Sequence, residues 1–184
     1  KRAFIAAAEA CKGEGGQVAL SLSDGFCVDR HRDSFLDLVN GHVDVLFANE
    51  SELTSLYSTD DFDSALAQVK GCCGVAALAR SERGSVVLSG DQRWDIPSYA
   101  LGDLIDTTGA GDLYAGGFLH GYTQGLALEA CGQIGSICAG QVVTQLGPRS
   151  QESLKDVVAP HLSYTDKPAK AVASSWALCT PRAH

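Results

Sequence analysis

Residues 106–112 read Asp-Thr-Thr-Gly-Ala-Gly-Asp, after a strand-like segment and before a helical one that begins at Leu113. Small residues at such a turn let backbone N–H groups approach a ligand closely, where a larger side chain would block it. The first turn of the following helix adds N–H donors without intrahelical partners and the positive end of the helix dipole. This combination predicts an anion pocket suited to a phosphate.

The second carboxylate of the stretch, Asp112, falls beside the predicted pocket. A carboxylate in that place can act as the general base that takes a proton from an attacking hydroxyl group. The stretch therefore favours a phosphoryl-transfer site. The alternative is a purely structural Gly-rich connection, since turns between a strand and a helix are common without any ligand.

The heptad closely resembles the signature of the ribokinase-like (PfkB) family of sugar and nucleoside kinases. The resemblance implies that Asp112 is the catalytic base. It also implies that the amides of Gly109, Ala110 and Gly111 form an anion hole for the transferring phosphate.

The same resemblance assigns Asp106 and Thr108 to a site for an activating monovalent cation, with K⁺ as the candidate ion. Residues 143–150, Val-Thr-Gln-Leu-Gly-Pro-Arg-Ser, approximately match the family's closing segment of the cation loop. Residues facing the adenine are expected around Ser136–Gly140, without individual assignment.

Residues 49–52, Asn-Glu-Ser-Glu, close a predicted strand and open a helix. Asn at the N-cap with Glu three residues later forms a capping box, a local role without chemistry. The family has an Asn-x-x-Glu motif at this junction, which implies that Glu52 organises Mg²⁺ through its water shell while Asn49 approaches the nucleotide phosphates. Mg²⁺ suits this arrangement because it keeps most of its waters and takes few protein oxygens. The two roles are compatible.

Residues 79–84, Ala-Arg-Ser-Glu-Arg-Gly, lie between another predicted strand and a hairpin. By themselves they read as a polar turn in which Gly84 supplies a positive φ. The family has a nucleotide-binding segment here, which implies phosphate or ribose contacts for Arg80 or Ser81 and matches at Gly84. Ala79 replaces the usual Thr, so one hydrogen bond to the nucleotide is missing from the pattern.

Residues 23–33 are polar and rich in ionisable groups. We interpret them as a loop and a solvated helix start capped by Asp29 or Asp33. The stretch resembles the adenosine kinase-like branch of the family, which favours a nucleoside such as adenosine as the phosphate acceptor.

Strands and helices alternate along the chain, which predicts an α/β fold with a largely parallel sheet flanked by helices. The predicted strands are residues 17–22, 43–47 and 75–79, with a hairpin at 86–88 and 93–96. The predicted helices are residues 2–12, 32–39, 50–57 and 61–70, one from 110, and further helices at 128–145 and 151–158. Ligands of such sheets bind at the carboxyl ends of the strands, where the motifs above fall.

The resemblance covers residues 1–158 and corresponds to the C-terminal part of the family fold. The family's N-terminal region, with a Gly-Gly substrate segment and a β-sheet lid that closes on the acceptor, has no counterpart in the sequence. The chain contains no Met, so we expect it to begin inside a longer reading frame. We expect residues 1–160 to form the nucleotide-binding and catalytic part, and residues 161–184 a loose tail. Without a lid, this piece alone should be weakly active or inactive.

Composition indicates a globular protein: of 184 residues, 45% are hydrophobic and 20% are charged. The net charge of −8 argues against nucleic acid or an anionic membrane as the main partner. No apolar run approaches membrane-spanning length, and no secretory segment is present. The seven cysteines lack the spacing of a zinc site. We therefore expect a soluble, cytoplasmic protein with reduced cysteines.

Together these features predict an ATP- and Mg²⁺-dependent phosphotransferase acting on an alcohol group of a small-molecule sugar or nucleoside. The rival is a catalytically silent nucleotide-binding or regulatory protein of the same fold. A Rossmann-type dehydrogenase is disfavoured because no G-x-G-x-x-G follows an early strand, and Walker-type nucleotidases are excluded because G-x-x-x-x-G-K-[ST] is absent. Homodimerisation of the longer protein is left open.

Overall fold

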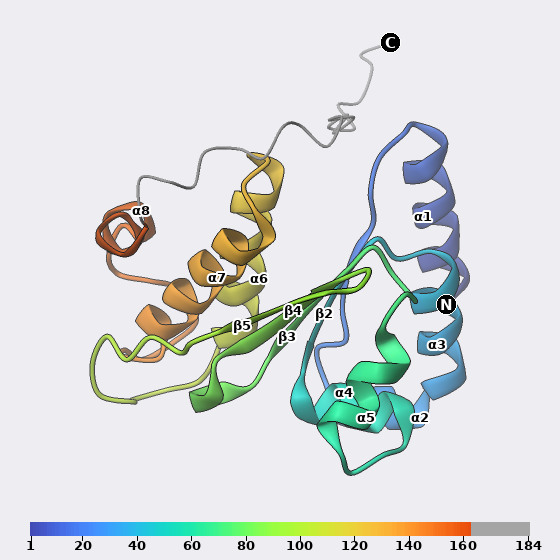
Figure 1. Cartoon of the computed structure of the whole chain (residues 1–184), viewed down its shortest axis with the longest axis horizontal. Coiled ribbons are helices and arrows are strands. Elements are labelled where there is room, and N and C mark those ends of the chain that lie inside the picture. The colour runs from blue at the N-terminus through green and yellow to red at the C-terminus, as the bar shows by residue number, and fades with distance from the viewer. Residues whose placement is uncertain (163–184) are drawn as a thin grey trace.

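A five-stranded sheet forms the centre of the computed structural model, which describes residues 1–162 (Figure 1). The predicted tail, residues 161–184, lies outside the described part apart from its first two residues. The strands are β1 (Ala19–Ser21), β2 (Val45–Asn49), β3 (Val75–Ala79), β4 (Ser85–Ser89) and β5 (Gln92–Ile96), side by side in that order.

Four of the five strands point in the same direction. β1, β2 and β3 pair parallel, and β4 pairs antiparallel with both β3 and β5, so β4 alone is reversed. The expected α/β class with a largely parallel sheet is confirmed. Because β1, β2 and β3 are parallel, their carboxyl ends lie at one edge of the sheet, where ligands of α/β folds bind.

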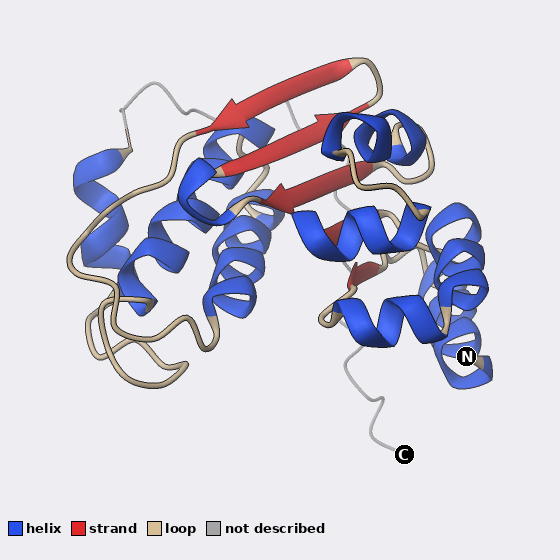
Figure 2. Ribbon diagram, turned by 90° about the horizontal axis from the view of Figure 1, so that it is seen from below, coloured by secondary structure: helices blue, strands red, loops and turns tan. Residues whose placement is uncertain are grey.

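Helices cover both faces of the sheet (Figures 1 and 2). One side carries α1 (Arg2–Gly13), α2 (Gly25–Arg30), α3 (Arg32–Gly41), α4 (Glu50–Tyr57) and α5 (Phe62–Val69). The other side carries α6 (Ala110–Thr123) and α7 (Leu128–Val142), with α8 (Leu154–Val158) against α7. Short 3₁₀ turns, η1 (Ser81–Arg83) and η2 (Ala159–His161), complete the elements.

Alternation along the strands divides the core between these two faces. In β2, Leu46 and Ala48 pack into the cluster beneath α2–α5, whereas Val45 and Phe47 pack into the cluster beneath α6 and α7. The Phe47 ring meets Phe118 of α6 edge to face, with ring centroids 5.5 Å apart. This packing fixes α6, and with it the turn at its N-terminus, to β2.

The main difference from the expected elements is α2, which occupies a stretch predicted to be loop. The Asp24 side chain caps this helix by accepting hydrogen bonds from the N–H groups of Phe26 and Cys27. The predicted caps are wrong: the Asp29 carboxylate pairs with Arg32, and Asp33 lies in the first turn of α3. An Asx cap directly before a short helix looks the same in sequence as a turn.

Smaller differences concern element ends. β1 begins at Ala19 instead of residue 17, α7 ends at Val142 instead of 145, and α8 begins at Leu154 instead of 151. Cys131 and Cys138 are buried on α7 as expected, and the six cysteines of the described chain are free thiols. Cys179 lies outside the described residues.

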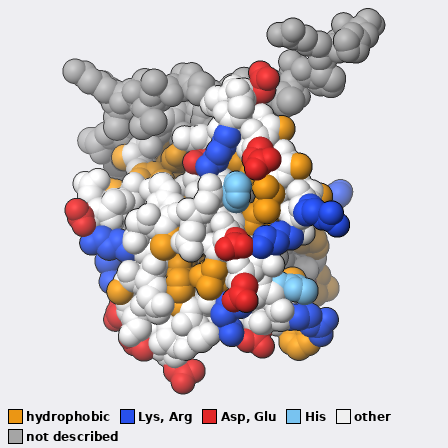
Figure 3. Space-filling model, turned by 90° about the vertical axis from the view of Figure 1, so that its right-hand side faces the viewer, with side chains coloured by type: hydrophobic (Ala, Val, Ile, Leu, Met, Phe, Trp, Pro, Cys, Tyr) orange, Lys and Arg blue, Asp and Glu red, His pale blue; other side chains and the backbone are white. Residues whose placement is uncertain are grey.

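The face formed by α1–α5 carries Lys and Arg side chains interspersed with Asp and Glu (Figure 3). It shows no broad basic field of the kind that binds nucleic acid. Over the described part of the chain, none of the helices combines the length and the apolar character needed to cross a membrane.

Candidate active site

Most of the predicted site residues meet at the carboxyl ends of β1, β2 and β3. A cavity of about 350 Å³ opens there, between the strand ends and the first turn of α6. It is lined by Ser21, Ser23, Phe47, Ala48, Asn49, Glu52, Ala77, Ala79, Gly109, Gly111, Asp112 and Tyr114. We call residues 109–112 the anion turn, after their predicted role. This turn and the Asn-x-x-Glu motif, about 60 residues apart in sequence, share one cavity, which we call the first cavity.

The anion turn has a backbone that requires glycine at its first position. Gly109 is the N-cap of α6 and has a φ of 82°, in the left-handed region that L side chains rarely adopt. A Cβ there would lie 2.6 Å from Cβ of Pro148 and 2.8 Å from its Cα. By contrast, a Cβ on Gly111 would meet nothing within 4 Å, so the space beside that residue is open to a ligand.

Two backbone donors of this turn are available to an anion. The N–H of Ala110 donates to the Thr107 carbonyl at 3.1 Å, but no described residue accepts from the N–H of Gly111 or Asp112. Orphan N–H groups at a helix N-terminus, together with the helix dipole, attract negative charge. The turn therefore offers two N–H donors to an anion.

Asp112 is the third residue of α6 and is exposed to solvent. Its side chain lines the first cavity together with Asn49 and Glu52. No hydrogen bond or ion pair to another described residue engages its carboxylate. This carboxylate is therefore free to accept a proton from a hydroxyl group bound in the first cavity.

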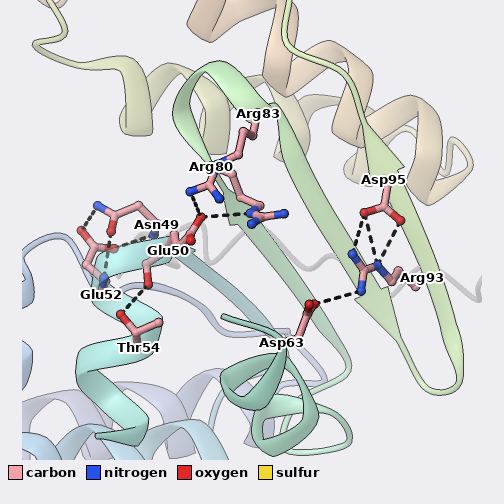
Figure 4. Close-up of polar contacts among 9 residues, drawn as sticks. All are labelled: Asn49, Glu50, Glu52, Thr54, Asp63, Arg80, Arg83, Arg93 and Asp95. Atoms are coloured by element: carbon pink, nitrogen blue, oxygen red, sulfur yellow. Dashed lines mark hydrogen bonds and ion pairs between the residues drawn. The ribbon is translucent and has the colours of Figure 1, made fainter. Parts of the chain in front are cut away.

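Asn49 and Glu52 form the predicted capping box at the start of α4 (Figure 4). The Asn49 side-chain oxygen accepts from the Glu52 N–H at 2.8 Å, and the Glu52 carboxylate accepts from the Asn49 backbone N–H at 2.9 Å. The Asn49 side-chain amide also donates to Glu52, at 2.8 Å. The local role is confirmed, and both side chains still line the first cavity.

Glu52 is only 6% exposed. Burial raises the pKa of its carboxyl group, the Asn49 backbone hydrogen bond opposes that shift, and the nearby charge of Asp24 adds to it. A buried acid with a raised pKa on a cavity wall is typical of functional sites.

Mg²⁺ fits the residues present. No group of three or more His, Cys, Asp or Glu side chains able to hold a metal ion occurs in residues 1–162. An ion held through its own water shell needs only one or two protein oxygens, however, and the Asn49–Glu52 pair supplies them on the cavity wall.

Asp106 ties the anion turn to the loop that follows α7. Its carboxylate accepts hydrogen bonds from the Thr108 N–H at 2.9 Å, the Thr108 hydroxyl at 2.7 Å and the Gly147 N–H at 2.9 Å. These bonds lower the pKa of Asp106, the Thr108 hydroxyl contributing most. The structure thus brings the two predicted cation-site residues beside residues 143–150, the predicted closing segment.

Arg80 and Ser81 line a second cavity of about 500 Å³, which shares Asn49 and Ala79 with the first. The Arg80 guanidinium does not point freely into it. Its Nε donates to Glu50 at 3.0 Å, and its central carbon lies 4.1 Å from the centre of the Phe62 ring. Ser81 has a left-handed φ of 53°.

Gly84 lies on neither cavity wall. Its φ of 81° agrees with the positive value expected, and a Cβ there would lie 2.0 Å from the Ile96 carbonyl oxygen. Packing against the end of β5 therefore explains this glycine.

The expected adenine region is also partly interior: Ser136 is 7% exposed, and its hydroxyl lies 3.3 Å from that of Ser85.

Ser21 and Ser23 are cavity residues that the sequence analysis did not single out. Ser23 adopts a left-handed φ of 64° and its hydroxyl donates to the Ser21 carbonyl at 3.3 Å. The available signal was two small hydroxyl residues at the end of a predicted strand, since strand ends of a parallel sheet carry the ligand site.

The family model for pfkB carbohydrate kinases matches residues 1–155. The chain belongs to the pfkB family of carbohydrate kinases. A nucleoside kinase of Methanocaldococcus jannaschii is 32% identical over 71% of this chain and 42% of its own length. A cytidine kinase of Thermococcus kodakarensis is 31% identical over 64% of this chain and 43% of its own length. The chain therefore spans less than half the length of these pfkB relatives.

Solved structures agree with this family assignment. The adenosine kinase from Sinorhizobium meliloti superposes with a TM-score of 0.84 and 45% identity, covering 87% of this chain and 49% of that one. A probable sugar kinase from Rhizobium etli superposes with a TM-score of 0.82 and 46% identity, covering 84% of this chain and 47% of that one. The arrangement of strands and helices described above is thus the ribokinase-like one.

Proposed function

We propose that this protein transfers the γ-phosphate of ATP to an alcohol group of a sugar or nucleoside, with Asp112 as the general base. The observation that carries the proposal is the first cavity, in which Asp112, the open face of the anion turn and the Asn49–Glu52 pair lie together. Membership of the pfkB family supports the reaction class. Relatives named nucleoside, cytidine and adenosine kinase support the class of acceptor.

Each group in the cavity has a distinct role in this proposal. ATP, bound with Mg²⁺, supplies the phosphoryl group in an in-line displacement. The backbone at Gly109, Ala110 and Gly111 forms the anion hole, in which the unpaired N–H groups of Gly111 and Asp112 and the dipole of α6 stabilise negative charge on the transferring group, while the Ala110 N–H bonds to the Thr107 carbonyl and holds the turn closed. The Asp112 carboxylate receives the proton of the acceptor hydroxyl. Asn49 and Glu52 would hold the Mg²⁺ ion through its waters.

A monovalent cation beside the anion turn belongs to the same proposal. An ionised carboxylate offers about four lone-pair positions. Three hydrogen bonds from Thr108 and Gly147 occupy the Asp106 carboxylate, which leaves one position for an ion such as K⁺. An ion there would strengthen the field that the turn presents to phosphate.

We further propose that residues 1–184 alone transfer phosphate slowly. Asp112 is exposed in this chain, and the chain covers under half the length of its curated relatives. Transfer to an alcohol competes with hydrolysis unless water is excluded from the acceptor side.

The test is an ADP-release assay with ATP and Mg²⁺ on a panel of adenosine, other nucleosides, ribose and fructose. The protein expressed from the complete reading frame and the 184-residue chain are assayed in parallel. ADP formation that depends on one acceptor class supports the proposal and names the substrate. ATP binding without turnover on any acceptor would instead favour the silent nucleotide-binding protein.

A further inference from the structure

Glu50 links the start of α4 to the turn at residues 80–84, and both segments line the second cavity. It is the first residue of α4, directly after the cap Asn49, and its side chain turns away from the capping box (Figure 4). One carboxylate oxygen accepts from Arg80 Nε at 3.0 Å and from Arg83 Nη2 at 2.6 Å. These two arginines flank the turn after β3, so a single carboxylate holds both ends of that turn.

The Glu50 contacts are partly shielded from water. The side chains of Glu50 and Arg80 are 26% and 20% exposed, while that of Arg83 is 56% exposed. The inner guanidinium of Arg80 also stacks over the buried Phe62 ring. Charge-assisted hydrogen bonds and cation–π stacking in a half-buried setting fix a side chain far better than a surface ion pair does.

No other hydrogen bond or ion pair in residues 1–162 joins α4 to the turn at residues 80–84. The turn itself is closed by internal bonds, among them Gly84 N–H to the Ser81 carbonyl at 3.0 Å. Ser81 holds a left-handed φ within it. The β2–β3 ladder, which pairs Asn49 with Ala79, and a hydrogen bond from the Ser98 hydroxyl to the Glu82 carbonyl at 2.7 Å also hold the turn. Glu50 adds the direct side-chain tie between the turn and α4.

We propose that Glu50 is a positioning residue for nucleotide binding: it sets the Arg80–Arg83 turn against the Asn49–Glu52 pair so that the two cavities bind one nucleotide. This inference rests on the proposed function, because it assumes that the nucleotide occupies the edge of the sheet shared by both cavities. The shared wall residues, Asn49 and Ala79, are the observation that joins the two spaces.

The direction in which Glu50→Gln changes ATP affinity distinguishes a positioning role from a purely electrostatic one. Glu50→Gln removes a negative charge near a polyanionic ligand, which by Coulomb's law alone would tighten ATP binding. Loss of the contacts that position the Arg80–Arg83 turn would instead weaken ATP binding. We expect the dissociation constant for ATP–Mg²⁺ to rise roughly three- to tenfold, the range that a partly shielded ion pair supports. The turnover number at saturating ATP should stay within about twofold, because Glu50 does not line the first cavity.

The matched control is Asp95→Asn, which breaks a carboxylate–arginine pair with Arg93 on β5, outside both cavities (Figure 4). It makes the same change in net charge and should leave ATP affinity unchanged. In a double-mutant cycle, Arg83→Gln should weaken binding less in the Glu50→Gln background than in the wild type. Thermal unfolding of every variant reports any loss of folded protein.

Calorimetric titration of ATP–Mg²⁺ into these variants, with steady-state assays beside it, decides the question. Weaker binding for Glu50→Gln, a normal turnover number and non-additivity with Arg83→Gln support the inference. Binding equal to or tighter than that of Asp95→Asn would overturn it while leaving the proposed function intact. ATP binding that is weakened by Glu50→Gln, in a wild-type protein that transfers phosphate to no acceptor, would overturn the proposed function alone. Failure of the wild type to bind ATP at all would overturn both.

Discussion

The Gly147 N–H donates a hydrogen bond to the Asp106 carboxylate at 2.9 Å, across 41 residues of sequence. This bond, with the contact of Pro148 at Gly109, places the loop after α7 directly against the turn that begins α6. The anion turn is therefore held in place by residues of a distant loop, Gly147 and Pro148. Its geometry depends on two loops that the fold brings together.

The hydrogen bonds of Asp106 predict that Asp106→Asn changes the response of the rate to K⁺. The substitution replaces a charged acceptor by a neutral one, so the Thr108 and Gly147 donors lose their stronger partner. If an ion such as K⁺ binds beside Asp106, exchange of Na⁺ for K⁺ should raise the wild-type rate and have little effect on the variant. Steady-state rates in the two salts at equal ionic strength measure this. An equal K⁺ response in both proteins would contradict the assignment.

Two glycines of the anion turn predict opposite defects. Gly109→Ala forces a left-handed φ and a clash with Pro148, and should lower the free energy of unfolding by about 1–3 kcal/mol. Gly111→Ala meets open space in a helical turn, so the free energy of unfolding should stay equal or rise by up to about 1 kcal/mol. Its methyl group occupies the space a phosphate needs, and ATP affinity should fall by more than about tenfold.

Denaturant unfolding and ATP titration on both variants distinguish these outcomes. Gly111→Ala serves as the control for Gly109→Ala, because each adds one methyl group to the same turn. Unchanged ATP affinity in a folded Gly111→Ala protein would show that phosphate does not approach this turn.

The buried carboxyl group of Glu52 predicts a pH dependence of stability. Its pKa in the folded protein is raised above the ordinary value of 4.5, so the folded state holds a proton over a range in which the unfolded chain has lost it. The free energy of unfolding should therefore fall as pH rises from about 4.5 through the raised pKa. Glu52→Gln removes this titration, since a neutral amide replaces the acid, and should flatten that part of the profile.

Urea unfolding of the wild type and Glu52→Gln at several pH values tests this. Glu9→Gln, an exposed substitution on α1, is the control for a general change in charge. We expect the free energy of unfolding to fall with pH in the wild type and in Glu9→Gln, and to fall less in Glu52→Gln. The same pH profile in all three proteins would contradict the role of burial. Under the proposed function, Glu52→Gln should also raise the Mg²⁺ concentration needed for half-maximal activity.

Sequence patterns predicted the elements where periodicity is strong. The apolar runs of β2 and β4 are local properties, and both strands lie within two residues of their expected positions. The anion turn and the capping box are also local, so Gly109 and Asn49 could be placed from sequence. Helix α2 was missed because its cap, Asp24, belongs to a stretch that is equally compatible with a turn.

The contacts that could not be predicted are long-range. Glu50 pairs with Arg80, 30 residues further along the chain, and no local pattern in either segment predicts this pairing. Gly84 was matched to a nucleotide segment, but its requirement for glycine comes from the Ile96 carbonyl at the end of β5. Such pairings depend on how strands stack in the sheet, which a local pattern does not encode.

The turnover number of Asp112→Asn tests the central claim most directly. The protein with its best acceptor from the panel is assayed for ADP release, and ATP–Mg²⁺ binding is titrated in the same samples. We expect ATP affinity within about twofold of the wild type and a turnover number lower by roughly 10²- to 10⁴-fold, the contribution typical of a general base. A fall of less than about tenfold would contradict the assignment of Asp112 as the base that accepts the hydroxyl proton.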